Sequence, residues 1–276
     1  MRAWLAARAI PGVEHVSDDG YARTARIDNA CLVVHVRHRP HATSFEMTVH
    51  ASGTVDVREV SARVCRVLGI DRDVSAAAAH LAQDPRLASA LARHPGLHVP
   101  GGWDPFELAV RVVLGQQVTI AAARRLASDL VGACGTPLPA QLCEPGLTRI
   151  FPRPHEMASA DLSLLRMPAA RRATLRALAD AAVADPGLLQ PEASLDTAIA
   201  RLRAVKGIGD WTAHYIALRA LRHPDAFPSS DAGLLRGAAR VLGARPSPAG
   251  LLARAEAWRP HRAYAAQLLW AEDGAS

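Results

Sequence analysis

The clearest chemical potential in this sequence lies in one carboxylate and in a short glycine turn that precedes it. Asp231 ends the segment 225–231, Asp-Ala-Phe-Pro-Ser-Ser-Asp, at the expected start of a helix. An aspartate in that position is commonly an N-cap, whose side chain accepts a hydrogen bond from a backbone amide of the first turn. The helix dipole would also hold the same carboxylate ionised beside a cleft. Because the two roles are compatible, Asp231 is the candidate catalytic residue.

The glycine turn is Val205-Lys206-Gly207-Ile208-Gly209. Two glycines around one apolar residue let the chain turn tightly between two helices, place Ile208 in the core and direct backbone N–H groups outward. Together with the start of the following helix, these groups form an anion site suited to a phosphate. A simple packing corner between two helices has the same pattern, so the turn alone does not identify a function.

A wider pattern around the turn resembles the signature of the helix-hairpin-helix DNA glycosylase superfamily. It consists of Gly207-Ile208-Gly209-x-Trp211-Thr212-Ala213-x-Tyr215, followed by Phe227 and Asp231. Two further segments are similar to the bacterial DNA-3-methyladenine glycosylase II branch: 104–107 leading to 114–118, and 258–265 with Trp270. The resemblance covers nearly the whole chain, because that branch also carries an N-terminal α+β module.

The resemblance implies a monofunctional DNA glycosylase of base excision repair. Such an enzyme flips an alkylated base, of the 3-methyladenine or 7-methylguanine type, out of duplex DNA and hydrolyses its N-glycosidic bond, leaving an abasic site. The resemblance also implies Asp231 as the catalytic carboxylate and Trp211, Tyr215 and Trp270 as the base pocket.

Elementary chemistry agrees with these roles. Alkylation at a ring nitrogen leaves a purine positively charged, and an aromatic face attracts a cation by about 0.5–2 kcal/mol. A fixed carboxylate can stabilise the positive charge that develops on the sugar, or activate water. Without the resemblance, Tyr215 and Trp270 are typical of a helix core.

One position separates the branches of the superfamily. Members that also nick DNA through a Schiff base carry a lysine two residues after the second hairpin glycine, and this chain has Trp211 there. No amine nucleophile is expected at that place, which predicts hydrolysis without strand cleavage. Lys206 precedes the glycines, where it contacts a phosphate or is simply solvated.

The predicted DNA contacts come from Lys206, Gly207, Gly209 and Thr212 around the turn, and from Gln117. A flipped base leaves a gap in the duplex that a side chain usually fills. Gln117 is the candidate wedge, although the family's best-known pattern has leucine there. Its amide would hydrogen-bond the opposite base, or alternatively cap the helix near 118–119.

Composition agrees with a nucleic-acid partner without identifying one. The 276 residues carry a net charge of +6 and a pI near 9.7, which favours a polyanion, although a basic protein with no nucleic-acid role fits too. Lys206 is the only lysine, and a coding sequence rich in G and C would also favour arginine over lysine. The abundance of arginine is therefore weak evidence for a nucleic-acid partner. The four cysteines, at positions 31, 65, 134 and 143, form no C-x-x-C pair, so no metal or cofactor is expected.

The sequence also predicts a cytoplasmic monomer with no membrane association. Apolar stretches are interrupted well before the ~18 residues that a membrane-spanning helix needs. Arg8 interrupts the apolar run that a secretory signal would require.

The spacing of apolar residues predicts the elements that must position these side chains, and it changes from a strand pattern to a helix pattern along the chain. Alternating strands are predicted at 22–27, 31–36 and 44–49, followed by a helix over 56–68 that Gly69 ends. They indicate an α+β fold that begins with a small antiparallel sheet module with a helix, over residues 1–98. After the turn-rich stretch 94–102 the apolar residues recur at helical spacing, which predicts an all-α helix-hairpin-helix glycosylase domain over 99–276. Asp104 and Pro105 begin its first helix, which runs to about Gly115. Further helices are expected at 120–132, 169–184, 195–204, 211–221, 232–242, 248–258 and 261–272.

Alternatives remain open at this point. A non-catalytic helix-hairpin-helix DNA-binding protein would use the same turn and the same basic charge. A glycosylase of the same fold for oxidised, deaminated or mismatched bases would not need a cation-binding pocket. A piece of an alkylation-response fusion is a third possibility, although no upstream cysteine cluster supports it.

Family members also usually begin with an extra strand before the helix that residues 4–8 resemble, so the sheet is one strand shorter or the start was assigned downstream.

Overall fold

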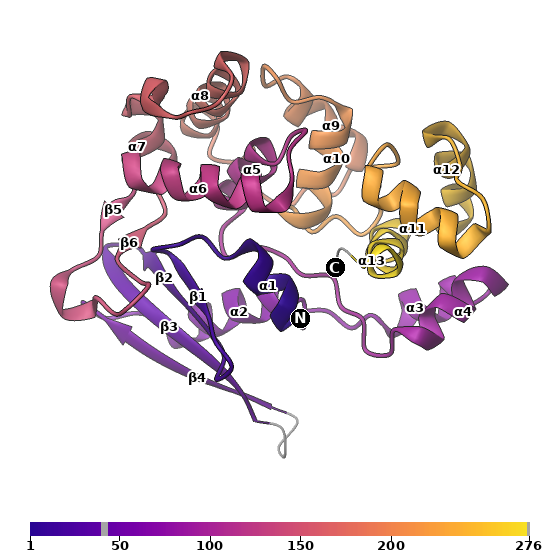
Figure 1. Cartoon of the computed structure of the whole chain (residues 1–276), viewed down its shortest axis with the longest axis horizontal. Helices are drawn as coiled ribbons and strands as arrows, with labels where there is room; N and C mark the ends of the chain where they lie inside the picture. Colours follow the sequence, from indigo (N-terminus) through magenta and orange to yellow (C-terminus); the bar gives the residue numbers. More distant parts are fainter. Residues whose placement is uncertain (40–43, 275–276) are drawn as a thin grey trace. The chain divides into compact units, whose positions relative to one another are not determined.

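A computed structural model describes residues 1–39 and 44–274. Packing divides the chain into two compact units, residues 1–64 with 110–186 and residues 65–109 with 187–276 (Figure 1). Each unit combines segments from both sides of residue 98. The boundary at 98/99 therefore stays a prediction about which segments fold alone.

The first unit is built on a four-stranded antiparallel sheet of order β1-β2-β3-β4. Three of its strands lie where alternation predicted them, and the short β1 was not predicted. The edge strand β4 alternates between half-buried and exposed residues, whereas the central β3 is buried on both faces over its first half. The strands are β1 (Glu14–Val16), β2 (Tyr21–Ile27), β3 (Ala30–Arg39) and β4 (Ser44–Ala51).

Strand β2 differs from the predicted alternation, because nearly all of its residues are buried. Its polar side chains are buried with partners: Arg23 lies 3.7 Å from the Glu14 carboxylate, and the Thr24 hydroxyl donates to the Arg149 carbonyl at 2.6 Å. Paired groups of this kind tolerate burial. The polar positions of β2 therefore do not mark a solvent-exposed face.

Helices and a small second sheet complete the first unit. Helix α1 packs on α6, α7 packs on α8, and β6 lies against β2. Helices α2 and α5 carry the chain from one unit to the other. These elements are α1 (Arg2–Arg8), α2 (Val57–Leu68), α5 (Pro105–Leu114), α6 (Ile120–Cys134), β5 (Thr136–Pro137), β6 (Arg149–Ile150), α7 (Pro154–Ser159) and α8 (Ala169–Ala184), with 3-10 turns at Ala140–Leu142 and Leu162–Leu164.

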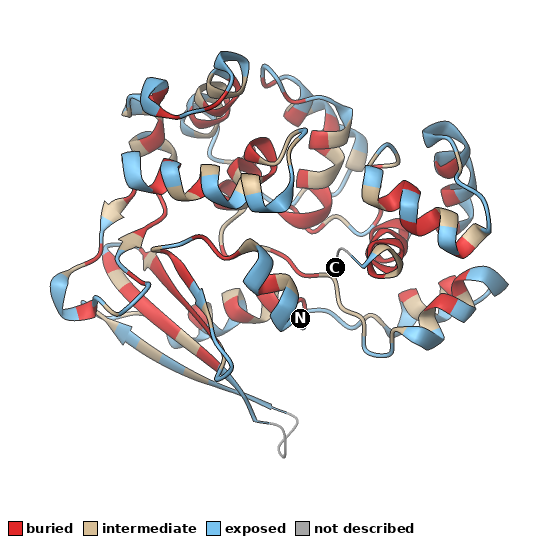
Figure 2. Ribbon diagram, in the orientation of Figure 1, coloured by how far each residue is buried: buried red, intermediate tan, exposed pale blue. Residues whose placement is uncertain are grey.

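The second unit is helical and is organised around α13, which is buried along most of its length (Figure 2). Helix α11 packs closely on α13, and α4 contacts both. At Gly237 a Cβ would lie 1.8 Å from the Leu269 carbonyl oxygen, so only glycine permits this approach. The helices are α3 (Ser75–Leu81), α4 (Pro85–Arg93), α9 (Leu195–Arg203), α10 (Asp210–Arg219), α11 (Ala232–Leu242), α12 (Pro248–Ala255) and α13 (Arg262–Asp273), with a 3-10 turn at Glu256–Trp258.

The predicted α+β fold class is confirmed, and the helices predicted from residue 104 onward are present within a few residues of their expected ends. Asp104 accepts from the Glu107 amide at 3.0 Å, as its predicted N-cap role requires. Gly69 follows α2 with φ +73°, the left-handed conformation expected of a glycine stop. Helices α3, α4 and α7, which are seven, nine and six residues long, were not predicted.

Candidate active site

Asp231 lies at the N-cap of α11 and accepts hydrogen bonds on both carboxylate oxygens. Its Oδ1 accepts from the Leu234 amide at 2.9 Å, the bond that defines the cap. The Trp270 indole Nε1 donates to the same oxygen at 2.8 Å, and the Trp211 indole Nε1 donates to Oδ2 at 2.9 Å. The cap and the candidate catalytic group are thus the same side chain, fixed by donors from three helices.

The three predicted pocket aromatics form one row. Trp211 and Tyr215 are four residues apart on α10, with ring centroids 5.4 Å apart. Tyr215 and Trp270 are also 5.4 Å apart, with the rings tilted by 55°. Trp270 is 5% exposed, so it belongs to the core of its unit as well as to the site. The structure therefore brings the predicted carboxylate and all three aromatics together.

Sequence reasoning missed the hydrogen bonds that the two indoles donate to Asp231. It assigned Trp211 and Trp270 to the base pocket by their π faces only. No spacing rule links positions 211 and 270 to one carboxylate, because the three residues come from α10, α11 and α13. Both tryptophans thus have an edge bound to Asp231 and a face directed elsewhere.

A buried arginine stacks on the aromatic row. The Arg219 guanidinium carbon lies 4.7 Å from the Trp270 ring centroid and 5.8 Å from that of Tyr215. Its Nη1 donates to the Pro100 carbonyl at 2.9 Å, and the residue is 3% exposed. The sequence carried one signal for it, since Arg219 follows Tyr215 by four residues on the same helix.

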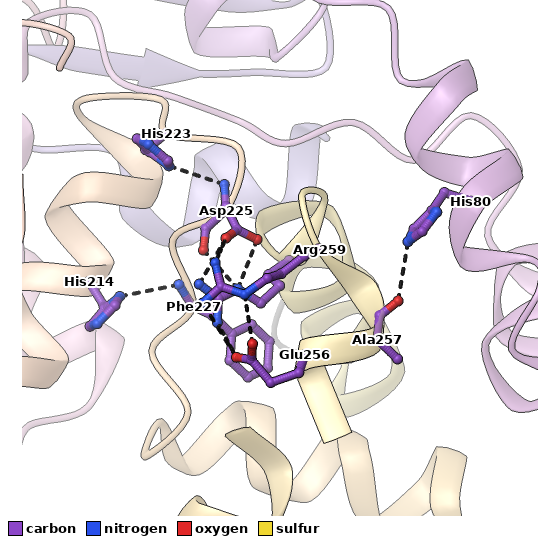
Figure 3. Close-up of polar contacts among 9 residues, drawn as sticks. His80, His214, His223, Asp225, Phe227, Glu256, Ala257 and Arg259 are labelled. Carbon is purple, nitrogen blue, oxygen red and sulfur yellow. Dashed lines mark hydrogen bonds and ion pairs between the residues drawn. The ribbon is translucent and has the colours of Figure 1, made fainter. Parts of the chain in front are cut away.

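The segment that joins α10 to α11, and so carries Asp231, is held by a buried ion pair (Figure 3). Arg262, the first residue of α13, donates to the two oxygens of Asp225 at 2.8 and 2.9 Å. Arg259 pairs with the same carboxylate, and Glu256 accepts from Arg262 at 3.0 Å. This bidentate arrangement fixes orientation as well as charge.

A histidine provides a second anchor in the same segment, visible in Figure 3. The Phe227 amide donates to Nδ1 of His214 at 3.3 Å, and the Phe227 ring meets Trp258 edge-on at 6.0 Å. Burial lowers the pKa of the His214 imidazole, so the ring stays neutral and keeps an acceptor for this amide. Asp231 therefore follows a segment anchored to both α10 and α13.

At Gly207 and Ile208 the glycine turn has the conformation that its sequence predicted. Ile208 is 5% exposed and belongs to the core, and Gly207 has φ +87°. Gly209 is the N-cap of α10 in an ordinary extended conformation, and a Cβ there would meet no atom within 4 Å. The chain itself therefore does not require glycine at 209, and the open space there is available to a partner.

The remaining predicted DNA-contacting residues differ in exposure. Lys206 is exposed beside the turn. Thr212 is only 3% exposed, so its hydroxyl has little access to solvent, although its backbone lies in the first turn of α10. Gln117 belongs to the first unit, where it is exposed between α5 and α6 with φ +55°.

Other candidate sites are separate from this one. A cavity of about 100 Å³ in the first unit is lined by residues that include His15, His35 and Glu144, and by none of the predicted site residues. Within residues 1–39 and 44–274, no cluster of three or more His, Cys, Asp or Glu side chains is arranged to hold a metal ion. None of the helices described is both long and apolar enough to cross a membrane.

Comparison with known sequences gives a consistent result. The AlkA N-terminal domain family matches residues 1–104. A probable bifunctional transcriptional activator/DNA repair enzyme AlkA of Mycobacterium tuberculosis is 39% identical over 268 residues, which cover 96% of this chain and 53% of that relative. The chain thus spans about half the length of the mycobacterial protein. DNA-3-methyladenine glycosylase 2 of Escherichia coli is 32% identical over 282 residues, covering 99% of this chain and 93% of the relative.

Solved structures share the fold. A 3-methyladenine DNA-glycosylase from Archaeoglobus fulgidus superposes with a TM-score of 0.82 at 21% identity, covering 99% of this chain and 93% of that one. The 3-methyladenine DNA glycosylase of Schizosaccharomyces pombe, solved in complex with abasic DNA, has a TM-score of 0.59 at 24% identity, covering 71% of this chain and 95% of that one.

Proposed function

The chain belongs to the DNA-3-methyladenine glycosylase family, and from that premise we propose that it is a monofunctional DNA glycosylase. It releases alkylated bases of the 3-methyladenine and 7-methylguanine type from duplex DNA. The products are the free base and an intact abasic strand for base excision repair.

The observation that carries this proposal is the fixed carboxylate of Asp231. When the N-glycosidic bond breaks, its electron pair leaves with the base and positive charge develops on the sugar. A carboxylate held by three N–H donors needs no reorganisation to stabilise that charge. It also orients the water that adds to C1′ and accepts the proton which that water loses. An isolated N-cap would need only the Leu234 amide, so the two indole donors point to a further role.

The aromatic row supports a purine-binding role next to the carboxylate. Trp211 and Tyr215 are half-buried, and so retain accessible surface on which a flipped base would stack. A purine alkylated at a ring nitrogen is already a good leaving group, so it needs less protonation on departure. This chemistry suits a site whose central group is a carboxylate.

Trp211 also supports hydrolysis without strand cleavage. It stands two residues after Gly209, where a lysine would provide a Schiff-base nucleophile. Its indole N–H is already bound to Asp231 and is not nucleophilic. The only lysine of the chain, Lys206, lies before the turn.

The glycine turn and Gln117 are the proposed DNA contacts. Open space at Gly209 and the first turn of α10 suit a backbone phosphate, and Lys206 supplies positive charge beside it. Gln117 is the proposed wedge: its left-handed backbone costs about 1–3 kcal/mol in a non-glycine residue, and such strain is typical of functional positions. We expect a cytoplasmic monomer whose affinity for DNA falls steeply as salt concentration rises.

The test is a base-release panel with the purified chain. Duplexes each containing one 7-methylguanine, hypoxanthine or 8-oxoguanine are incubated with wild type, Asp231→Asn and the exposed control Asp180→Asn, and released bases are quantified by chromatography. We expect release of 7-methylguanine by wild type and by Asp180→Asn, with strands that break only after alkaline treatment. Release of no base would favour a non-catalytic DNA-binding protein, and release of 8-oxoguanine alone would favour an oxidised-base glycosylase.

A further inference from the structure

Trp270 lies between two opposite charges. Its indole edge donates to the Asp231 carboxylate at 2.8 Å, while the Arg219 guanidinium lies over its ring at 4.7 Å from the centroid. The same guanidinium lies 5.8 Å from the Tyr215 ring. Two members of the aromatic row therefore already interact with a cation that belongs to the protein.

The position of this cation is fixed. Arg219 is 3% exposed, its Nη1 donates to the Pro100 carbonyl at 2.9 Å, and its backbone is the last residue of α10. A buried guanidinium so held cannot rotate into solvent when a base enters. Its charge is also permanent, because arginine is not deprotonated in proteins.

A permanent cation in contact with the aromatic row has opposite effects on two kinds of purine. A base made cationic by alkylation is attracted by the negative face of an aromatic ring. A guanidinium on that ring uses part of the attraction and repels the incoming charge. A neutral purine is not repelled, and when the bond from C1′ to N9 breaks, the base takes the electron pair and becomes negative. A nearby positive charge stabilises that leaving group.

We propose that Arg219 is a positioning residue that sets the substrate preference of the site, acting through Trp270. It holds the indole against Asp231 and shifts the preference from cationic toward neutral purines. This inference rests on the proposed glycosylase function and deepens it. An aromatic pocket without the guanidinium would discriminate more strongly in favour of cationic bases.

The experiment compares one cationic with one neutral base on the same protein. Single-turnover release is measured from a duplex with one 7-methylguanine and from a matched duplex with one hypoxanthine. The readout is the ratio of the two rates, which does not depend on the fraction of folded protein, so a purely structural loss leaves it unchanged. The variants are Arg219→Gln and Arg219→Met, of which the second fills the buried space with apolar atoms.

We expect the 7-methylguanine to hypoxanthine ratio to rise about three- to tenfold in either variant, the effect of one cation–π contact of ordinary strength. The control Arg222→Gln removes a buried arginine that binds Asp71 and the Val99 carbonyl, and its ratio should equal that of wild type. A ratio unchanged or lowered in the Arg219 variants overturns the inference and leaves the proposed function standing. Release of neither base by wild type overturns the proposed function, and the inference with it.

Discussion

Replacing Trp211 by phenylalanine separates its two roles at the site. The substitution keeps an aromatic ring beside Tyr215, whose centroid is 5.4 Å away, and removes the Nε1–H that donates to Asp231 Oδ2 at 2.9 Å. A hydrogen bond to a charged group is worth about 1.5–3 kcal/mol. Because 1.36 kcal/mol corresponds to a factor of ten in rate, the loss predicts a ten- to hundredfold lower rate of base release.

The assay is single-turnover release of 7-methylguanine, together with the dissociation constant for abasic-site DNA. We expect the rate to fall and the dissociation constant to stay within about threefold of wild type, less than 1 kcal/mol in binding free energy. The matched control is Trp258→Phe, which keeps a ring beside Phe227 and also removes an indole contact with a carboxylate, that of Asp84 at 3.4 Å, outside the site. It should lower thermal stability and leave the rate per folded molecule unchanged. A wild-type rate in Trp211→Phe would refute the view that the indoles hold Asp231.

The other predictions concern the scaffold. Gly237→Ala places a Cβ 1.8 Å from the Leu269 carbonyl oxygen and should destabilise the protein by about 3 kcal/mol or more in urea unfolding. Gly132→Ala, on α6 where a Cβ meets open space, should be neutral or stabilising. Equal effects of the two substitutions would contradict the close packing of α11 on α13. Asp225→Asn leaves Arg262 without its main buried partner and should lower the free energy of unfolding by about 3 kcal/mol. Glu46→Gln, in an exposed pair, should lower it by less than about 1 kcal/mol. Equal losses would contradict the stabilising role of the buried pair between Asp225 and Arg262. Burial raises the pKa of the Glu14 carboxyl, but the Arg111 and Arg23 guanidiniums outweigh this and hold the pKa at about 2, against an ordinary 4.5. The stability that this group contributes is present above pH 4.5 and is lost as pH falls toward 2, so Glu14→Gln should make the free energy of unfolding depend less on pH in that window. An unchanged dependence on pH would refute this.

Sequence reasoning located the elements of the site because their signals are local. The N-cap role of Asp231, the turn at Gly207 and the helix that carries Trp211 and Tyr215 all follow from neighbouring residues. The pairing of α11 with α13 was not predictable from periodicity. It depends on Gly237, where only glycine leaves room for the backbone of the partner helix. That requirement is visible only once the position of the partner backbone is known.

Contacts between distant positions account for what the sequence did not reveal. Arg262 lies 37 residues from Asp225, and among many arginines nothing marked it as the one that clamps the segment before Asp231. Arg219 had a local signal, its spacing from Tyr215, but its stacking on Trp270 depends on the position of α13. Helix periodicity predicts which face of a helix is buried, and it does not show which buried charge meets which ring.

The most direct test of the central claim is the single-turnover rate of 7-methylguanine release by Asp231→Asn. The amide preserves the shape of the side chain and removes the negative charge that would stabilise the sugar. We predict a rate at least about a hundredfold below wild type, the scale of losing one preorganised electrostatic group, with affinity for abasic-site DNA retained and Asp180→Asn at the wild-type rate. Release at the wild-type rate by Asp231→Asn would contradict the account.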